Sequence, residues 1–114
     1  MMQLRDLKGP FHLNDATIDR EVEPSRAGVF VLSRPGIADF NYDFTSRSEI
    51  DVNNQLHVYV GDYGFFSFQV CASEQEAFAA ECHLWHDLKP LNNPAHPARP
   101  ARSAWKCPRC GLFS

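Results

Sequence analysis

The chain ends in WKCPRCGLFS, and the cysteine pair in this segment constrains the fold more than any other feature. Cys107 and Cys110 enclose a Pro-Arg turn, a common way to present two thiolates to one metal ion. The chain holds four cysteines and shows no secretory signal, which favours metal ligands or free thiols over a disulfide framework. Two thiolates make half of a tetrahedral site, so the remaining ligands must come from elsewhere in the sequence.

The strongest helix signal, over residues 73–88, supplies a second pair of ligands. Ser73 and Glu76 form a predicted capping box, and no helix breaker follows until Pro90. Cys82 and His86 lie four residues apart in this helix and therefore share one face. The predicted site is a zinc centre with four protein ligands: Cys82, His86, Cys107 and Cys110. His96 is an alternative to His86.

Such a site is closed, because no position is left for water, and a closed zinc site is structural rather than catalytic. Five prolines lie between residues 90 and 108, and a proline-rich segment of this kind needs a staple to stay packed on a domain. The alternative use of Cys107 and Cys110 is thiol redox chemistry. The absence of a thioredoxin-like βαβ pattern disfavours it.

An apolar run bounded by Pro24 and Pro35-Gly36 predicts a strand over residues 28–33, and alternating aromatic residues predict strands over residues 40–45 and 65–70. Residues 49–60 fit either a helix or a strand, and we favour the helix because a short hairpin needs a covering element. We predict an α+β fold in which helices flank a three-stranded antiparallel sheet. Residues 1–26 form an N-terminal arm, residues 27–93 the core, and residues 94–114 a zinc-binding tail on the same domain.

Charge is distributed unevenly along the 114 residues. All 14 acidic residues lie at or before Asp87, whereas the last 27 residues carry five basic and no acidic residues. A basic tail can bind nucleic acid or an acidic protein, or it can offset the charge of metal-bound thiolates. The candidate phosphate contacts are Arg99, Arg102, Lys106 and Arg109. No apolar run spans a membrane, and the N-terminus has no apolar leader, so we expect a cytoplasmic protein.

The order of elements resembles the GIY-YIG nuclease-like domain over residues 24–111. Gly28-Val29-Phe30 matches the first signature of that family, and Pro90 and Asn92 match its closing Pro-x-Asn. The helix motif E-C-x-x-x-H and the tail motifs HPARP and WKCPxC are similar to those of a small zinc-containing branch. The resemblance implies phosphodiester hydrolysis, in which two tyrosines, an arginine and a glutamate act with Mg²⁺ or Mn²⁺.

This chain departs from the family at the positions that carry the chemistry. The two tyrosines fall on Phe30 and Phe44, the arginine on Gln55, and the metal-binding glutamate on Glu81. Phenylalanine has no hydroxyl and glutamine has no charge. We therefore predict a catalytically degenerate domain that binds nucleic acid or protein. The alternatives are a divergent nuclease that uses Glu81 with Arg47 or His57, and a structural subunit of a larger assembly. Glu81 can also serve as an ion-pair partner of Arg47.

Overall fold

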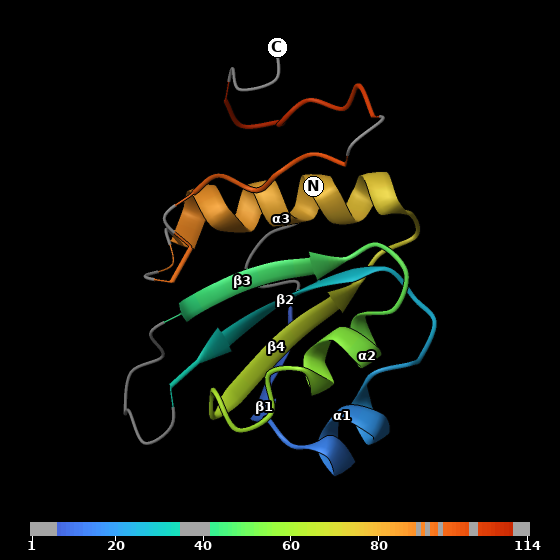
Figure 1. Ribbon diagram of the computed structural model, residues 1–114, viewed down its shortest axis with the longest axis vertical. Coiled ribbons are helices and arrows are strands. Elements are labelled where there is room, and N and C mark those ends of the chain that lie inside the picture. Colours follow the sequence, from blue (N-terminus) through green and yellow to red (C-terminus); the bar gives the residue numbers. More distant parts are fainter. Residues whose placement is uncertain are drawn as a thin grey trace.

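The computed structural model describes residues 7–34, 42–88, 90, 92–93, 95–100 and 103–110. Its centre is a four-stranded antiparallel sheet with strand order β1-β4-β2-β3 (Figure 1). In chain order the strands are β1 (Lys8–His12), β2 (Gly28–Ser33), β3 (Tyr42–Ser48) and β4 (Phe65–Val70). The helices are α1 (Asp15–Glu21), α2 (Val52–His57) and α3 (Glu74–Leu88).

Helices cover both faces of the sheet, so the domain has three layers (Figure 1). The alternation of β2 divides its side chains between two cores. Phe30 and Leu32 belong to the core beneath α1 and α2, whereas Val29 and Val31 pack with residues of α3. All four side chains are at most 2% exposed, which explains why β2 reads as a continuous apolar run. Among the described residues, no helix is long and apolar enough to cross a membrane.

Gly28, at the start of β2, is required by close packing. A Cβ atom at this position would lie 2.6 Å from the carbonyl oxygen of Gln69 and 3.0 Å from the Val52 side chain. Both neighbours are constrained, since Gln69 is paired with β2 in the sheet and Val52 is buried in α2. Any larger residue would push α2 and β4 away from β2. Close packing thus explains why the Gly28-Val29-Phe30 motif begins with glycine.

The α+β class and the long helix are confirmed, and all three predicted strands are present. The second runs over Tyr42–Ser48 rather than 40–45, and residues 40 and 41 lie outside the described residues. Ser73 Oγ accepts a hydrogen bond from Glu76 N at 3.1 Å, and Glu76 Oε1 accepts one from Ala72 N, also at 3.1 Å. The ambiguous segment is helical over Val52–His57, and Asp51 caps it by accepting from Asn54 N. These capping hydrogen bonds join residues within one helical turn, so they can be recognised from the sequence.

The N-terminal segment differs from the prediction. The sequence assigned residues 1–26 to an N-terminal arm, left open whether this arm folds back onto the sheet, and gave the sheet three strands. Instead, β1 pairs with β4 as a fourth strand, and α1 buries Ile18 completely. Gly9 and Pro10 interrupt β1, and its side chains are mostly exposed, so neither the composition nor the periodicity marks it as a strand.

The turn after α3, which contains Asn92 and Asn93, contacts the sheet at the outer edge of β3. Asn93 Oδ1 accepts from Thr45 N at 2.7 Å, and Asn93 Nδ2 donates to Thr45 O at 2.9 Å. One amide side chain thus forms both hydrogen bonds that a neighbouring strand would supply. Asn92 N donates to Asp43 O at 2.7 Å, and Trp85 Nε1 of α3 donates to Asn93 O at 2.7 Å. The turn after α3 is therefore fixed on both the helix and the sheet.

Candidate metal centre and neighbouring pocket

Two histidines and two cysteines converge where α3 ends and the tail folds back. One ligand atom from each of these residues lies within 4.8 Å of all the others: His86, His96, Cys107 and Cys110. Cys107 Sγ is 3.4 Å from His86 Nε2, and Cys110 Sγ is 3.6 Å from His96 Nε2. Tetrahedral zinc with ordinary bond lengths holds sulfur and nitrogen about 3.5 Å apart. The cluster has the donor set and the spacing to hold a metal ion such as zinc.

Neighbouring groups orient these ligands. His96 Nδ1 lies 2.8 Å from Pro97 O and donates to it, which leaves the lone pair of Nε2 facing Cys110. Arg109 N donates to Cys107 Sγ at 3.4 Å. Burial raises the pKa of Cys107, but hydrogen bonds from the Arg109 backbone and from His96 outweigh it, and the pKa falls to about 6. Cys107 is therefore prepared to act as a thiolate, the form that binds metal.

Cys82 is not part of this cluster. The sequence proposed it as the fourth ligand with His86, because the two share a helix face. In the structure Cys82 is fully buried and packs with Phe78 and Cys107, and the group of donor atoms close enough to share a metal ion contains His96 and not Cys82. Burial raises the pKa of Cys82 well above its ordinary value, and its neighbour Cys107 raises it further. Cys82 lies beside Cys107 in the packing between α3 and the tail, and both histidines considered as ligands from the sequence, His86 and His96, enter the cluster.

Further contacts hold the tail on α3. Trp105 packs against Phe78, with ring centroids 6.2 Å apart. Arg109 Nη1 forms an ion pair with Asp87 at 2.7 Å and donates to His83 O at 3.5 Å. Of the four basic residues proposed as phosphate contacts, only Arg109 takes part in these contacts among the described residues; Lys106 is exposed, and Arg102 lies outside the described residues. Arg109 contributes to the packing of the tail in this arrangement.

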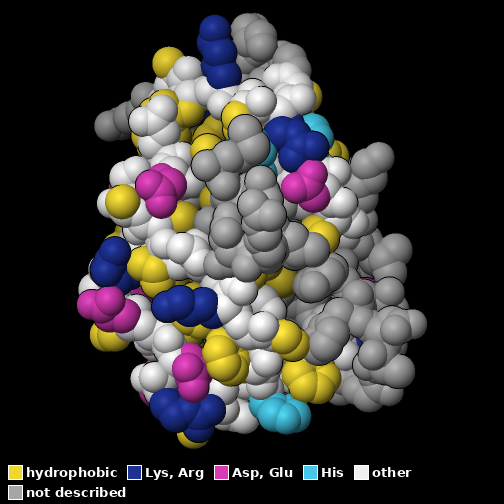
Figure 2. All heavy atoms as spheres, turned by 180° about the vertical axis from the view of Figure 1, so that it is seen from behind, with side chains coloured by type: hydrophobic (Ala, Val, Ile, Leu, Met, Phe, Trp, Pro, Cys, Tyr) yellow, Lys and Arg dark blue, Asp and Glu magenta, His cyan; other side chains and the backbone are white. Residues whose placement is uncertain are grey.

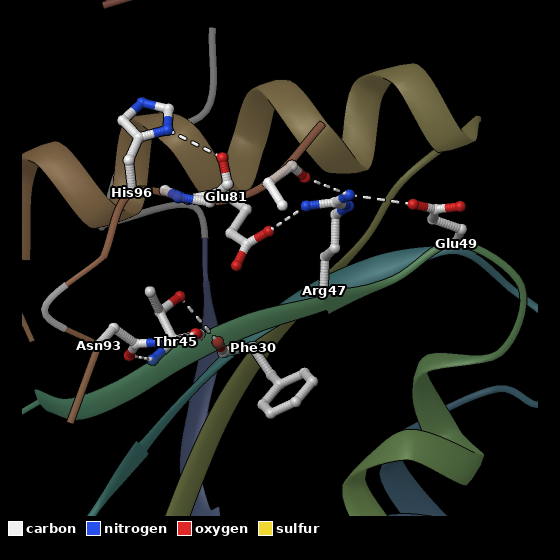
Figure 3. A network of polar contacts seen from close by, with 9 residues as sticks. Phe30, Thr45, Arg47, Glu49, Glu81, Asn93 and His96 are labelled. Carbon is white, nitrogen blue, oxygen red and sulfur yellow. Dashed lines mark hydrogen bonds and ion pairs between the residues drawn. The ribbon is translucent and has the colours of Figure 1, made fainter. Parts of the chain in front are cut away.

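A pocket of about 360 Å³ lies beside the metal centre, between β3, α2, α3 and the tail. Its lining includes three of the positions singled out from the sequence, namely Arg47, Gln55 and Glu81, together with Glu49 and Ala98. Figure 3 shows Arg47 rising from β3 toward Glu81 on α3, with Glu49 on its other side. Gln55 contributes a neutral amide to this lining, so Arg47 is the cation at its centre.

Arg47 and Glu81 form a buried ion pair. Arg47 Nη1 lies 2.6 Å from Glu81 Oε1, and the two side chains are only 13% and 9% exposed. Arg47 Nη2 also donates to Glu49 Oε1 at 3.0 Å and to Ala98 O at 2.8 Å (Figure 3). Burial raises the pKa of Glu81, while the hydrogen bond and charge of Arg47 act in the opposite direction. The guanidinium thus binds three oxygen atoms, and the ion pair with Glu81 is the alternative role that the sequence left open for this glutamate.

Phe30 and Phe44 lie away from this pocket. Phe30 is 0% exposed, and Phe44 packs against both Phe30 and Tyr59, with ring centroids 6.4 and 5.1 Å away. Both rings belong to the core on the α1 and α2 side of the sheet. They contribute packing and have no hydroxyl with which to activate water.

His57, considered from the sequence as a substitute catalytic group, instead joins α2 to α1. Its Nδ1 lies 2.6 Å from Asp15 Oδ1, and its Nε2 lies 2.9 Å from Asp19 Oδ1. The hydrogen bond to Asp15 raises the pKa of His57 and the one to Asp19 adds to it, whereas partial burial opposes both. With both nitrogens engaged, this side chain holds the two helices together.

This contact predicts a pH-dependent stability. A histidine with a raised folded pKa stabilises the fold fully below its unfolded pKa of about 6.5, and the effect is lost as pH rises through the folded value. We expect His57→Gln to lower the melting temperature more at about pH 5.5 than at about pH 8.5, by about 2 °C. Thermal denaturation followed by circular dichroism measures this. An equal effect at both pH values would contradict the charged contact.

Comparison with known proteins finds one solved structure with a similar fold. Neither the protein-family models nor the curated proteins gave a match to the sequence. Among solved structures, the chain is similar to the GIY-YIG N-terminal endonuclease domain of UvrC from Thermotoga maritima, bound to its catalytic magnesium. The TM-score is 0.53 at 20% identity, and the match covers 68% of this chain and 96% of that chain. The chain has the GIY-YIG fold.

The GIY-YIG fold agrees with the family resemblance that the sequence shows. Arg47, Gln55 and Glu81 line the pocket, whereas Phe30 and Phe44 do not. Sequence reasoning missed the contributions of Glu49 and Ala98. The pairing of Arg47 with Glu49 spans only two residues and was accessible in principle, but the contact with Ala98 depends on the path of the tail.

Proposed function

We propose that this chain is a catalytically inactive GIY-YIG domain, stapled by a structural zinc ion, that serves as a binding module. The zinc ligands would be His86, His96, Cys107 and Cys110, because their donor atoms have the spacing of a tetrahedral site. Two thiolates and two imidazoles suit zinc better than magnesium or calcium, which take oxygen ligands. Four protein ligands leave no open position for a reacting water.

The observation that carries the proposal is the Arg47–Glu81 ion pair. In the family, the glutamate at this position holds a divalent cation that stabilises the charge of the transition state. Here the Glu81 carboxylate already has a cation at 2.6 Å, and Glu49 binds the same guanidinium. A metal ion at Glu81 would have to displace Arg47 from a buried site. Gln55, Phe30 and Phe44 would remain unable to replace the missing charge and hydroxyls.

The proposal predicts that the purified chain does not cut nucleic acid. With Mg²⁺ or Mn²⁺ present, we expect cleavage of single-stranded, duplex and branched DNA and RNA at less than about 10⁻³ of the rate of an active nuclease, since each lost electrostatic group costs about 10² to 10³. Glu81→Gln should leave any background unchanged. Cleavage that requires a divalent cation and disappears in Glu81→Gln would instead establish a divergent nuclease.

A nucleic-acid partner would be bound by the basic tail. On the face shown in Figure 2, Lys and Arg side chains alternate with Asp and Glu, so the described residues of that face present no surface of one sign. The pocket itself contains two carboxylates and one guanidinium, which repels a phosphodiester. Arg99 and Lys106 are exposed on the tail and provide the positive charge for phosphate contacts. An acidic protein segment is the alternative partner for the same residues.

The nucleic-acid interaction can be tested by its salt dependence. The logarithm of the binding constant for a duplex oligonucleotide should fall with the logarithm of salt concentration, and Lys106→Ala should reduce the slope by about 0.9. Arg20→Ala on α1, which removes an arginine whose side chain is 65% exposed, is the matched control and should leave the slope unchanged. Fluorescence anisotropy measures both. A flat salt response, or equal effects of the two substitutions, would favour a protein partner instead.

A further inference from the structure

The segment 95–100, here called the strap, connects the metal centre with the pocket. His96 near its start belongs to the metal cluster, and the carbonyl oxygen of Ala98 accepts a hydrogen bond from Arg47 Nη2 at 2.8 Å. Ala98 also lines the pocket. Only Pro97 therefore separates a metal ligand from a pocket contact, so a displacement of His96 is expected to move Ala98 as well.

Figure 3 shows how the strap is placed. His96 lies above α3, and the chain then runs along the helix to Arg47, which projects toward it from β3. Between these points Pro97 is buried, and its carbonyl oxygen accepts from His96 Nδ1 at 2.8 Å. The hydrogen bond that orients the His96 ring is thus made by the strap itself. Binding of a metal at His96 Nε2 fixes the ring, and the ring fixes the backbone of the strap.

Arg47 depends on the strap for part of its environment. Glu81 and Glu49 supply two of the oxygens around its guanidinium, and Ala98 supplies the third. The face of the guanidinium lies over the Phe78 ring, 5.2 Å from its centroid. Arg47 Nε is buried and has no hydrogen-bond partner among the described residues, so the contacts described do not use every donor of the guanidinium group. Removal of the strap would expose the guanidinium on the side that now faces Ala98.

We propose that the metal centre controls access to the pocket, because metal binding closes the strap over Arg47. Loss of the metal releases the strap, removes the Ala98 contact and exposes Arg47 to solvent and to ligands. This inference rests on the proposed metal loading and goes beyond it, because a structural staple alone has no effect on the pocket. The chain thereby couples the state of its metal centre to the surface where the fold family places its chemistry.

The sheet itself does not depend on the strap. The two cores on either side of the sheet are formed by residues that precede α3 or lie within it, from Leu13 to Leu84. Three of the four metal ligands lie in the tail, and the fourth, His86, lies in the last turn of α3. Release of the metal therefore opens the strap while β2, which is paired on both sides, stays folded.

Arginine modification by phenylglyoxal, read by peptide mass spectrometry, tests this coupling in the full chain with zinc bound and after chelation. Because a hydrogen bond to a charged group is lost, we expect Arg47 to react at least about tenfold faster in the chelated chain. Arg20, already exposed, should react equally in both states. His96→Ala should make Arg47 reactive even when zinc is supplied. Hydrogen exchange of the β2 amides should remain slow throughout.

The possible outcomes separate this inference from the proposed function. A chain that binds zinc stoichiometrically but keeps Arg47 equally protected after chelation overturns the strap inference and leaves the staple intact. Loss of protection in β2 together with Arg47 also overturns it, because the opening would then be global unfolding. A chain that binds no zinc overturns both proposals. Faster modification of Arg47 with β2 still protected supports control of the pocket by the metal.

Discussion

Replacing Cys107 with serine is expected to abolish stoichiometric zinc binding and to lower the melting temperature by about 10 to 20 °C. Serine has nearly the same size, but its hydroxyl is a poor zinc ligand at neutral pH. A ligand that binds only the folded chain stabilises it by about 4 kcal/mol when present at a thousandfold excess over its dissociation constant. Cys107 is also buried at the contact between the tail and α3, where Phe78 and Cys82 pack against it.

The measurements are metal analysis of the purified protein and thermal denaturation with and without a chelator. Cys71→Ala is the matched control, because Cys71 is equally buried but belongs to the core on the other side of α3. It should retain zinc and respond to the chelator as the unmodified chain does. If Cys107→Ser keeps one zinc per chain, or if the chelator shifts both variants equally, Cys107 is not a ligand.

Replacing Arg47 with methionine is expected to destabilise the fold by about 3 to 5 kcal/mol. The substitution keeps most of the apolar length of the side chain. It leaves the Glu81 side chain, which is only 9% exposed, without its counter-charge. An unpaired buried carboxylate must lose its negative charge or draw water into the site, and both cost free energy. Urea denaturation at neutral pH measures the loss. The zinc content should stay at one per chain, since Arg47 contacts none of the described cysteines.

The double variant Arg47→Met with Glu81→Leu separates the ion pair from packing. Replacing both members of a buried pair with apolar residues is often neutral, so most of the lost stability should return. Glu49→Gln is the control, since Glu49 is 33% exposed and its pair with Arg47 should contribute less than about 1 kcal/mol. A single variant as stable as the unmodified chain would mean that Glu81 is not held by Arg47.

The parts of the fold that follow from local chemistry could be predicted from the sequence. The capping box at Ser73, the apolar run of β2 and the aromatic alternation of β4 act within a few residues, and the structure confirms the helix and both strands. β1 could not be recognised in the same way. It is an exposed edge strand containing Gly9 and Pro10, and only its pairing with β4 makes it a strand.

The metal centre shows a similar division. The spacing of Cys107 and Cys110 was enough to predict that they belong to the cluster, and the position of His86 on α3 was enough to predict its place there. Helical spacing alone favoured Cys82 as a ligand beside His86. Residues four apart on an ideal helix differ by about 40° in direction, however. In the structure the short Cys82 side chain points into the apolar cluster with Phe78. His96 reaches the cluster because the tail folds back, a long-range event that no local pattern records.

X-ray absorption spectroscopy at the zinc edge tests most directly the central claim, that a closed metal centre staples the tail to a GIY-YIG core. The account predicts two sulfur ligands at about 2.3 Å and two nitrogen ligands at about 2.0 Å, from Cys107, Cys110, His86 and His96. Three sulfurs and one nitrogen would contradict it and return Cys82 to the site. An oxygen from water in place of one histidine would contradict the closed, structural character of the centre.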